Sequence, residues 1–453
     1  MTMRFSFPHP MTLLVACIAI AAALTWVIPA GEFARQEDPA SGRSVVVPGS
    51  YHAVAATPVG PFEMLIALPR GMVEAAEVIF LVFMTGGAFT VVDRTGTIRG
   101  LLERLVRSLG KHEMLVIPIA SIAFAAGGAL FNMSEEIIAL VPVLVLITAG
   151  LGLDAVVAVS MSIGAAAVGS AFSPINPFQV GIAQKIAQVP LLSGSSYRIV
   201  LLTVALTFWI LGTMRYARKT RVEPALTSHE TERVDATSAD GTRHVVILLM
   251  VLATFGTYVY GTLKLDWGFN QMSGIFFLMG VLAGLVGGLG VDGTAKAYVD
   301  GFRDMAFAGL LIGFARAIFV VLNDGHIIDT IVNGAFQPLS GLPGTASALG
   351  MMGVQALIHV PVPSVSGQAV LTMPILAPLS DLIGVSRQIT VLAYQIGGGL
   401  CDLLTPTNGS LMAVLAATTI RYDRWLRFAV PMWLMLMAIG GVAIVLAGAI
   451  GYH

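Results

Sequence analysis

The sequence predicts an all-α polytopic membrane protein made of two halves that lie in the membrane with opposite orientations. Three observations lead to this fold class: an apolar composition, a helix-breaking pattern that recurs at one offset, and a contrast in positive charge. Of the 453 residues, 56% are hydrophobic and only 11% are charged. A soluble domain carries about 25% charged residues, which excludes that class. The net charge of −1 gives no reason to expect a nucleic-acid partner.

The recurring pattern occurs twice, 232 residues apart. Residues 173–176 read Ser-Pro-Ile-Asn and residues 405–408 read Thr-Pro-Thr-Asn. The same offset aligns three upstream pairs, namely Ser134 with Ser366, Pro142 with Pro374 and Gly152 with Gly384. Such residues interrupt a helix and free backbone groups that lipid cannot satisfy, so they are tolerated where they line a protected cavity. Breaks at corresponding positions of two halves indicate the binding site of a secondary transporter.

The charge contrast concerns two segments at corresponding positions of the halves. Residues 94–111 contain Arg94, Arg99, Arg104, Arg107 and Lys111, whereas residues 323–343 contain no Lys or Arg. By the positive-inside rule the first segment lies in the cytoplasm and the second lies outside. Two similar halves in opposite orientations form an inverted repeat.

The first half is expected to cover residues 1–214. It opens with a membrane span at 11–30, favoured over a cleaved signal peptide because a single Arg precedes it and its length approaches that of a span. Its further elements are a polar stretch at 31–60, an interfacial helix at 61–75, a span at 76–93, an amphipathic in-plane helix at 95–109, a hairpin at 113–150, a span at 154–189 broken at 173–177, and a span at 197–214. The hairpin is expected to be re-entrant, because Glu135 and Glu136 are costly in a lipid-facing helix.

A polar cytoplasmic linker at 215–243 separates this half from the second half, residues 244–453. The second half repeats the order of the first. Its elements are spans at 245–263 and 271–290, a short interfacial segment, a span at 306–323, an amphipathic helix at 326–336, a re-entrant hairpin at 345–380 with its tip near 361–367, a span at 386–419 broken at 405–408, and a last span at 428–450. The total of about nine crossings and two hairpins places the N-terminus inside and the C-terminus outside.

Two polar constellations are the candidate site. The first combines Asn132, Ser134, Ser173 and Asn176, and the second combines Ser364, Ser366, Thr405 and Asn408. Side-chain oxygens and freed carbonyls at such positions suit a hard cation such as Na⁺, and helix N-termini attract a carboxylate. The alternative is that these residues only kink packed helices. Their recurrence at one offset favours a site.

Acidic residues distinguish the first tip from the second. Gly367 and Gln368 occupy the positions that correspond to Glu135 and Glu136. A buried carboxyl can take up a proton or pair with a cationic substrate, and a structural hydrogen bond at the tip is the alternative. Arg316 and Asp402 are expected either to contact substrate or to form ion pairs, and His359 is expected to have a polar packing role rather than a relay role. Cys17 and Cys401 lie in apolar runs and are expected to be small buried hydrophobes, without a disulfide or a metal.

Several motifs give the chain a likeness to a known family over nearly its full length. They are Ile28-Pro29-Ala30-Gly31-Glu32-Phe33, Pro48-Gly49-Ser50-Tyr51-His52, Met133-Ser134-Glu135-Glu136, Arg316 with the run Asp324-Gly325-His326-Ile327-Ile328-Asp329-Thr330, and Thr405-Pro406-Thr407-Asn408. At these residues the sequence resembles the YfcC-like branch of the anaerobic C4-dicarboxylate carrier (DcuC-type) family, within the wider ion-transporter superfamily.

The resemblance implies a scaffold domain and a transport domain that holds both hairpins and both broken helices. It also implies a homodimer formed through the scaffold. Some family members resemble dicarboxylate carriers and others are regarded as basic amino-acid antiporters. In Na⁺-coupled relatives the tips read Ser-Asn-Thr, and this sequence departs from that pattern at both tips, so Na⁺ and H⁺ both stay open as the coupling ion.

These observations together predict a secondary active transporter in the cytoplasmic (inner) membrane. We expect it to move a small carboxylate-bearing metabolite, such as a C4-dicarboxylate or an amino acid, by elevator-type alternating access. The alternative within this class is an antiporter of basic amino acids of the arginine/ornithine type. A channel or a membrane-embedded enzyme is the rival from another class. The sequence holds no nucleophile, metal or cofactor motif that favours an enzyme, and no cofactor is expected.

Overall fold

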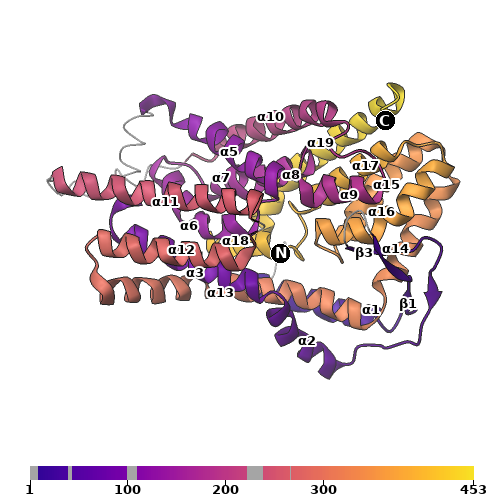
Figure 1. Ribbon diagram of the computed structural model, residues 1–453, viewed down its shortest axis with the longest axis horizontal. Coiled ribbons are helices and arrows are strands. Elements are labelled where there is room, and N and C mark those ends of the chain that lie inside the picture. The colour runs from indigo at the N-terminus through magenta and orange to yellow at the C-terminus, as the bar shows by residue number, and fades with distance from the viewer. Residues whose placement is uncertain (1–8, 39–42, 99–109, 222–237, 266, 453) are drawn as a thin grey trace, which may run out of the picture.

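The computed structural model describes residues 9–38, 43–98, 110–221, 238–265 and 267–452 (Figure 1). Within these ranges the regular structure is helical, apart from two small antiparallel sheets of two strands each. In the described part of the chain six helical segments are long and apolar enough to cross a membrane, namely Ala76–Arg94, Glu113–Leu130, Ser195–Lys219, Phe269–Val286, Gly290–Asp324 and Tyr422–Ala449. The all-helical, multi-span fold class is confirmed. The number of crossings and the re-entrant course of the hairpins stay predictions.

The first helix of the N-terminal region ends earlier than predicted. Helix α1 (Pro10–Leu24) is shorter than the expected span at 11–30, because the chain turns at Thr25. The Thr25 hydroxyl donates to the Ala22 carbonyl (2.7 Å) and accepts the N–H of Val59 (2.9 Å). The polar stretch that follows contains strands β1 (Gly31–Glu32), β2 (Arg35–Asp38), β3 (Arg43–Val46) and β4 (His52–Ala53), in which β1 pairs with β4 and β2 with β3.

The rest of the first half follows the predicted order. Its elements are α2 (Pro61–Glu74), α3 (Ala76–Arg94), η1 (Gly110–Leu115), α5 (Val116–Phe131), α6 (Glu135–Gly150), α7 (Ala155–Val159), the π-helical turn η2 (Ser160–Gly164), α8 (Ala165–Ala171), the π-helical turn η3 (Pro177–Gly181), α9 (Ile182–Ile186) and α10 (Ser195–Lys219). The amphipathic helix expected at 95–109 falls mostly outside the described residues. Helix α10 extends into the predicted linker, where its last turn carries Arg218 and Lys219. Basic side chains stabilise a helix C-terminus.

The second half contains one clear correction. Its elements are α11 (Ser238–Lys264), α12 (Phe269–Val286), α13 (Gly290–Asp324), α14 (Ile328–Phe336), η5 (Gln337–Gly341), α15 (Gly344–His359), α16 (Val365–Leu382), α17 (Arg387–Cys401), α18 (Gly409–Ala417) and α19 (Tyr422–Ala449). The predicted interfacial segment and the span at 306–323 are one continuous helix, α13, of 35 residues. Polar residues in its first half have partners on neighbouring helices: Asp300 pairs with Arg94 on α3, and the Tyr298 hydroxyl donates to the Phe277 carbonyl of α12.

Close helix packing brings each broken helix against the helix before a tip. A Cβ at Gly128 of α5 would lie 2.0 Å from the Ala166 carbonyl oxygen of α8, and one at Gly169 would lie 2.1 Å from that of Ala125. In the second half, a Cβ at Gly397 of α17 would lie 2.2 Å from the Met352 carbonyl oxygen of α15. Small residues therefore let the backbones approach closely, as is typical of membrane helices.

Two fully buried tryptophans on neighbouring helices form hydrogen bonds with the broken helices. Trp209 of α10 donates its indole N–H to the carbonyl of Ser160 (2.9 Å), and Trp425 of α19 donates to the carbonyl of Leu403 (2.8 Å). In Figure 1 helices α10 and α19 lie at the top and α13 at the bottom, and α8 and α18 lie between them. The two helix breaks are thus held in the interior of the protein.

Candidate functional site

Asn176 organises the first helix break, which lies between α8 and η3. Its Nδ2 donates to the Gly128 carbonyl (2.8 Å) and to Ser170 Oγ (3.3 Å). Its Oδ1 accepts the backbone N–H groups of Phe178 (2.9 Å) and Gln179 (3.1 Å). The side chain therefore satisfies a backbone carbonyl of α5 and two backbone N–H groups after the break, as burial requires.

Further hydrogen bonds tie this break to the second half of the chain. Ser173 Oγ donates to the Ala129 carbonyl (2.6 Å) and accepts the N–H of Asn176 (2.8 Å). Gln395 of α17 donates to the Ser173 carbonyl (2.7 Å), and Gln179 donates to the Gln395 carbonyl (2.9 Å). Ser173 and Asn176 are fully buried, so their hydrogen bonds shape the break.

The second break lies between α17 and α18, and Asn408 organises it. Its Oδ1 accepts the N–H of Leu411 (3.0 Å), which makes Asn408 the N-cap of α18. Its Nδ2 donates to Asp402 Oδ1 (2.5 Å). Thr407 Oγ1 donates to the Val360 carbonyl at the end of α15 (2.7 Å).

The two breaks share hydrogen-bond geometry under the offset of 232 residues. Ser170 corresponds to Asp402 and Gly128 corresponds to Val360. In each half the Asn side chain donates to the residue six positions before it, and a side chain of the break binds the carbonyl at the same place on the preceding tip helix. The recurring pattern thus reflects recurring local geometry.

Glu136 is held at the first tip by groups from two elements. Its carboxylate accepts the N–H of Ser134 (3.1 Å) and the hydroxyl of Tyr258 on α11 (3.1 Å). The side chain is buried, with 5% of the residue exposed. Asn132, two positions before Ser134, has left-handed backbone angles (φ 58°, ψ 40°), which Asn tolerates better than most residues.

Glu135 lies on the side of the tip that meets the second break. Ser134 Oγ donates to its Oε2 (2.5 Å), and the Ser410 hydroxyl of α18 also hydrogen-bonds this carboxyl group. Asp402 is close enough for its charge to act on Glu135. Two carboxyl groups from different halves of the chain therefore converge.

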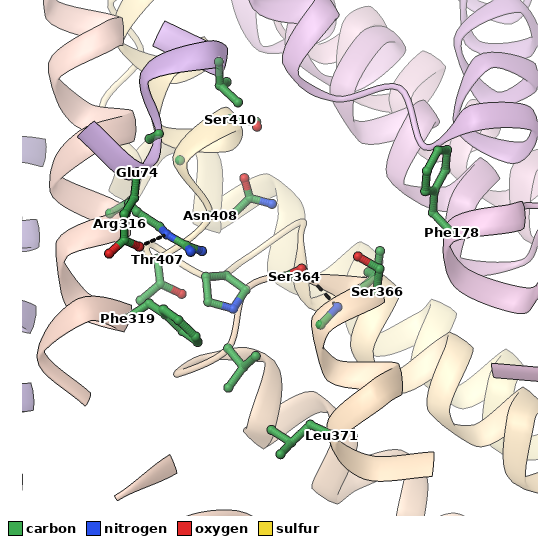
Figure 2. A pocket seen from close by; sticks show the side chains of 18 of the residues that line it. Glu74, Phe178, Arg316, Phe319, Ser364, Ser366, Leu371, Thr407, Asn408 and Ser410 are labelled. Carbon is green, nitrogen blue, oxygen red and sulfur yellow. Dashed lines mark hydrogen bonds and ion pairs between the residues drawn. The ribbon is translucent and has the colours of Figure 1, made fainter. Parts of the chain in front are cut away.

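Both tips and the second break open into one cavity of about 1080 Å³. Of the ten predicted site residues, seven line it: Asn132, Ser134, Glu135, Glu136, Ser364, Ser366 and Asn408. The other three, Ser173, Asn176 and Thr405, are buried behind the lining. Figure 2 shows Ser364, Ser366 and Asn408 around this space, with Phe178 on the other side.

Some residues that line this cavity were not among the predicted site residues. Phe178 and Ser410 both line it, and each stands two positions after the Asn of its break. The offset of 232 residues relates them and is the signal that would have found them. Thr407 and Tyr258 also line the cavity.

Ion pairs form another part of the cavity wall. Arg316 of α13 donates through Nε to Glu74 (2.9 Å), and its guanidinium carbon lies 4.6 Å from the ring centre of Phe319 (Figure 2). Arg35 of β2 pairs with Asp329 of α14 (2.9 Å). Among the residues that the structure describes, six carboxyl groups line the cavity, from Glu32, Glu74, Glu135, Glu136, Asp329 and Asp402, against two guanidinium groups and His326. The cavity therefore carries an excess of acidic groups.

The two motifs around residues 28–33 and 324–330 contact each other beside this wall. The N–H of Gly31 donates to the His326 carbonyl (2.9 Å), and the N–H of Phe33 donates to Asp329 Oδ2 (2.9 Å). Asp329 also accepts Arg35. The segment that contains β1 and β2 is thus fixed to the start of α14. Among the described residues no group of three His, Cys, Asp or Glu side chains is arranged to hold a metal ion.

Comparison with known proteins gives a consistent family match. The family model described as C4-dicarboxylate anaerobic carrier (DcuC) matches residues 7–449. YfcC of Escherichia coli (strain K12), whose name proposes a basic amino acid antiporter, is 33% identical over 100% of this chain and 98% of its own length. An uncharacterised protein of Haemophilus influenzae (strain ATCC 51907 / DSM 11121 / KW20 / Rd) is 29% identical over 97% of both chains.

Two solved structures are also similar to the chain at low identity. MtrF of Neisseria gonorrhoeae, described with a class of antimetabolite efflux pumps, has a TM-score of 0.42 at 17% identity, covering 97% of this chain and 95% of MtrF. The YdaH transporter of Alcanivorax borkumensis has a TM-score of 0.44 at 18% identity, covering 98% of this chain and 99% of YdaH.

Proposed function

We propose that this protein transports a basic amino acid. The chain belongs to the C4-dicarboxylate anaerobic carrier family and is a multi-pass membrane transporter. The observation that carries the proposal is the acidic excess in the cavity. Of the six carboxyl groups that line it among the described residues, those of Glu74 and Asp329 are paired with the two guanidinium groups, and the other four are not. A dianionic substrate would be repelled by these carboxylates, whereas a cationic side chain would be attracted. The name of the relative YfcC supports the same substrate class.

The two ends of such a substrate find different partners in the cavity. The cationic end pairs with Glu135 and Asp402, which approach each other from the two halves. The carboxylate end binds near the N-terminus of α16, where Ser364 and Ser366 line the cavity and the first N–H groups of the helix have no intrahelical acceptor. Arg316 adds a guanidinium whose Nε is held by Glu74. Its terminal nitrogens suit a carboxylate.

A C4-dicarboxylate is the second candidate, favoured by the helix N-termini of α16 and α18 at the cavity. A thermal-shift and counterflow screen separates the two. L-arginine, L-ornithine, succinate and fumarate are each tested with and without Na⁺ on purified protein and in proteoliposomes. Stabilisation and exchange with the basic amino acids alone are the expected result. Exchange with the dicarboxylates alone would contradict the proposal.

Arg316→Gln tests the carboxylate end of the proposed mode. We expect KM for L-arginine to rise by about tenfold, because a charge-assisted hydrogen bond contributes roughly 1.5–3 kcal/mol. Arg303→Gln is the matched control, since Arg303 lies on the same helix and pairs with Asp300 outside the cavity lining. An unchanged KM in Arg316→Gln would remove Arg316 from the binding mode.

We further infer secondary active transport across the cytoplasmic (inner) membrane by elevator-type alternating access, with the N-terminus inside. The shared hydrogen-bond geometry of the two breaks supports an inverted repeat, on which such movement depends. A homodimer through the scaffold belongs to the same proposal. Counterflow of labelled against unlabelled L-arginine distinguishes a carrier from a channel, and cross-linking in native membranes tests the dimer.

A further inference from the structure

A fully buried histidine lies next to the second break, at the last position of α15. The Nδ1 of His359 lies 2.8 Å from Gln368 Oε1, and its Nε2 lies 2.8 Å from Asp402 Oδ1. His359 is 0% exposed, whereas the Asp402 side chain is 23% exposed and lines the cavity. The last turn of a helix also stabilises a cation through the helix dipole. The pair thus connects a buried ring with the substrate space.

Neighbouring amides fix which atom faces the Nδ1 side of the ring. The Thr372 hydroxyl donates to the Gln368 carbonyl (2.8 Å), so it accepts from Gln355 Nε2 (2.9 Å). Gln355 Oε1 then accepts from Gln368 Nε2, which also donates to the Gln355 carbonyl (2.7 Å). Gln368 must therefore present Oε1 to the ring. Since a carbonyl oxygen only accepts, His359 Nδ1 carries a hydrogen.

The Nε2 side of the ring is determined in the same way. Asn408 uses Oδ1 to cap α18, so its Nδ2 donates to Asp402 Oδ1. That oxygen accepts from Asn408 and faces Nε2 as well, and an ionised carboxylate satisfies this arrangement by accepting both hydrogens. A hydrogen on Nε2 completes it. His359 is then an imidazolium paired with Asp402, a neutral combination that burial tolerates.

We propose that the His359–Asp402 pair is a proton-binding site that is coupled to occupancy of the cavity. With the cavity empty, His359 holds a hydrogen on each ring nitrogen. When the cationic group of a ligand lies against Asp402, the Nε2–H bond breaks and its electron pair stays on the nitrogen, so the ring becomes neutral. The released proton forms an O–H bond with water of the cavity and passes to solvent. This release step depends on the proposed basic substrate, whereas the proton site itself does not.

Few other titratable groups face the pair from the elements around it. Glu135 of α6 lies close enough to Asp402 for the two carboxyl groups to interact electrostatically. Cys401 of α17 is adjacent to Asp402 and donates through Sγ to the Ala356 carbonyl (3.1 Å). Tyr422 of α19 lies near Cys401, and its hydroxyl donates to the Leu404 carbonyl. Gln368 of α16 and Asn408 before α18 are neutral. Of these groups, Glu135 is the one other carboxyl group.

Nitrogen-15 NMR of histidine-labelled protein without ligand tests the site itself. The signal of His359 is assigned as the one lost in His359→Gln. We expect two protonated ring nitrogens in the wild type at about pH 7, and one protonated and one unprotonated nitrogen in Asp402→Asn, because the neutral amide no longer stabilises the cation. A wild-type ring that stays neutral throughout the range from about pH 5 to pH 8 would overturn the proposal.

Calorimetry with L-arginine in two buffers of different ionisation enthalpy tests the coupling. We expect release of about one proton per bound L-arginine in the wild type and none in His359→Gln. His244→Gln is the matched control, because the His244 ring contacts the Thr95 carbonyl and does not line the cavity. Equal proton release in His359→Gln and the wild type would contradict the coupling. If L-arginine does not bind to the wild type, the proposed substrate fails, and the NMR experiment still decides the proton site.

Discussion

The two helix breaks share their hydrogen-bond geometry but differ in charge and in access to the cavity. In the first break Asn176 binds the neutral Ser170, and the pair is sealed from the cavity. In the second break Asn408 binds the charged Asp402, and both line the cavity. At the tips the distribution is reversed, since the acids Glu135 and Glu136 stand where the second half has Gly367 and Gln368. The charge of the site is thus divided between the tip of one half and the break of the other.

The two halves thus share the backbone geometry of the break and differ in the side chains that surround it. An Asn at each break satisfies backbone groups that the interruption frees, so the two halves share this structural role. The position six residues earlier has no such duty in common, and it is Ser in one half and Asp in the other. Function is therefore expected at the positions where the halves differ, such as Glu135, His359 and Asp402.

The largest expected effect is a difference in stability between two variants in which each asparagine is replaced separately. Asn176→Ala leaves the buried Gly128 carbonyl and two backbone N–H groups without their partner, so stability should fall by about 3 kcal/mol. Asn408→Ala removes a helix cap, which is worth about 1 kcal/mol, and leaves Asp402 bonded to His359. Thermal unfolding in detergent measures the difference.

Transport gives the reverse order for the same pair of variants. Asn408→Ala should lose most of its L-arginine counterflow while staying folded, because Asn408 lines the cavity and orients Asp402. The counterflow lost by Asn176→Ala should match its loss of folded protein. Equal unfolding midpoints in the two variants would show that the two asparagines contribute equally to stability, which would contradict the prediction drawn from their different burial.

The sequence predicted the breaks and their relation because helix-breaking residues in apolar runs have few structural explanations. It could not tell that Ser173 and Asn176 are buried while Asn408 lines the cavity, because this depends on how α5 and α17 pack around each break. Partners distant in sequence were also inaccessible. Tyr258 reaches Glu136 from α11, and no local pattern marks a hydroxyl for that contact.

Local polarity gave one error for the same reason. The polar residues before residue 306 indicated an interfacial segment, yet they belong to the continuous helix α13 because Asp300 and Tyr298 find partners on α3 and α12. His359 was expected to pack as a polar side chain, and the structure adds that both ring nitrogens have oxygen partners. Tertiary partners decide whether a polar side chain in an apolar run ends a helix.

The next effect concerns the acids that only the first tip carries. Glu135→Gln should lower kcat/KM for L-arginine by at least about tenfold, since the amide keeps the shape and loses the charge that attracts a cation. Glu136→Gln should have a smaller effect of about 1 kcal/mol, because the Glu136 carboxyl group already accepts hydrogen bonds from Tyr258 and the Ser134 N–H. Radiolabelled counterflow measures both.

Asp300→Asn serves as the control for this pair, because it makes the same carboxyl-to-amide change in an ion pair with Arg94 away from the cavity lining. It should behave as the wild type in counterflow. Wild-type kinetics and wild-type substrate preference in Glu135→Gln would remove the first tip from substrate binding and leave Asp402 as the remaining acid at the site.

A smaller effect is expected from the two serines that the offset relates. Ser134→Ala removes a hydroxyl that donates to Glu135, so we expect KM for L-arginine to change by up to about tenfold. Ser366→Ala removes a hydroxyl that lines the cavity at the N-terminus of α16, and we expect a change of about threefold or less. If Na⁺ is the coupling ion and is bound by Ser366, the dependence on Na⁺ would instead disappear in Ser366→Ala, and that result would reverse the expected order.

The last prediction concerns topology rather than activity, and it tests whether the two halves have opposite orientations in the membrane. In a variant with Cys17 and Cys401 replaced by Ala, single cysteines are placed at Arg104 and at Gly334. A Cβ at Gly334 would meet no atom within 4 Å, so the change is tolerated there. The contrast between five basic residues in 94–111 and none in 323–343 predicts labelling of the first segment from the cytoplasm and of the second segment from outside.

An impermeant maleimide applied to intact cells should therefore react with the Gly334→Cys variant and not with the Arg104→Cys variant. Reaction of both positions from one side would mean that the halves share an orientation, and the matching geometry of Asn176 and Asn408 would then reflect a requirement of broken membrane helices in general.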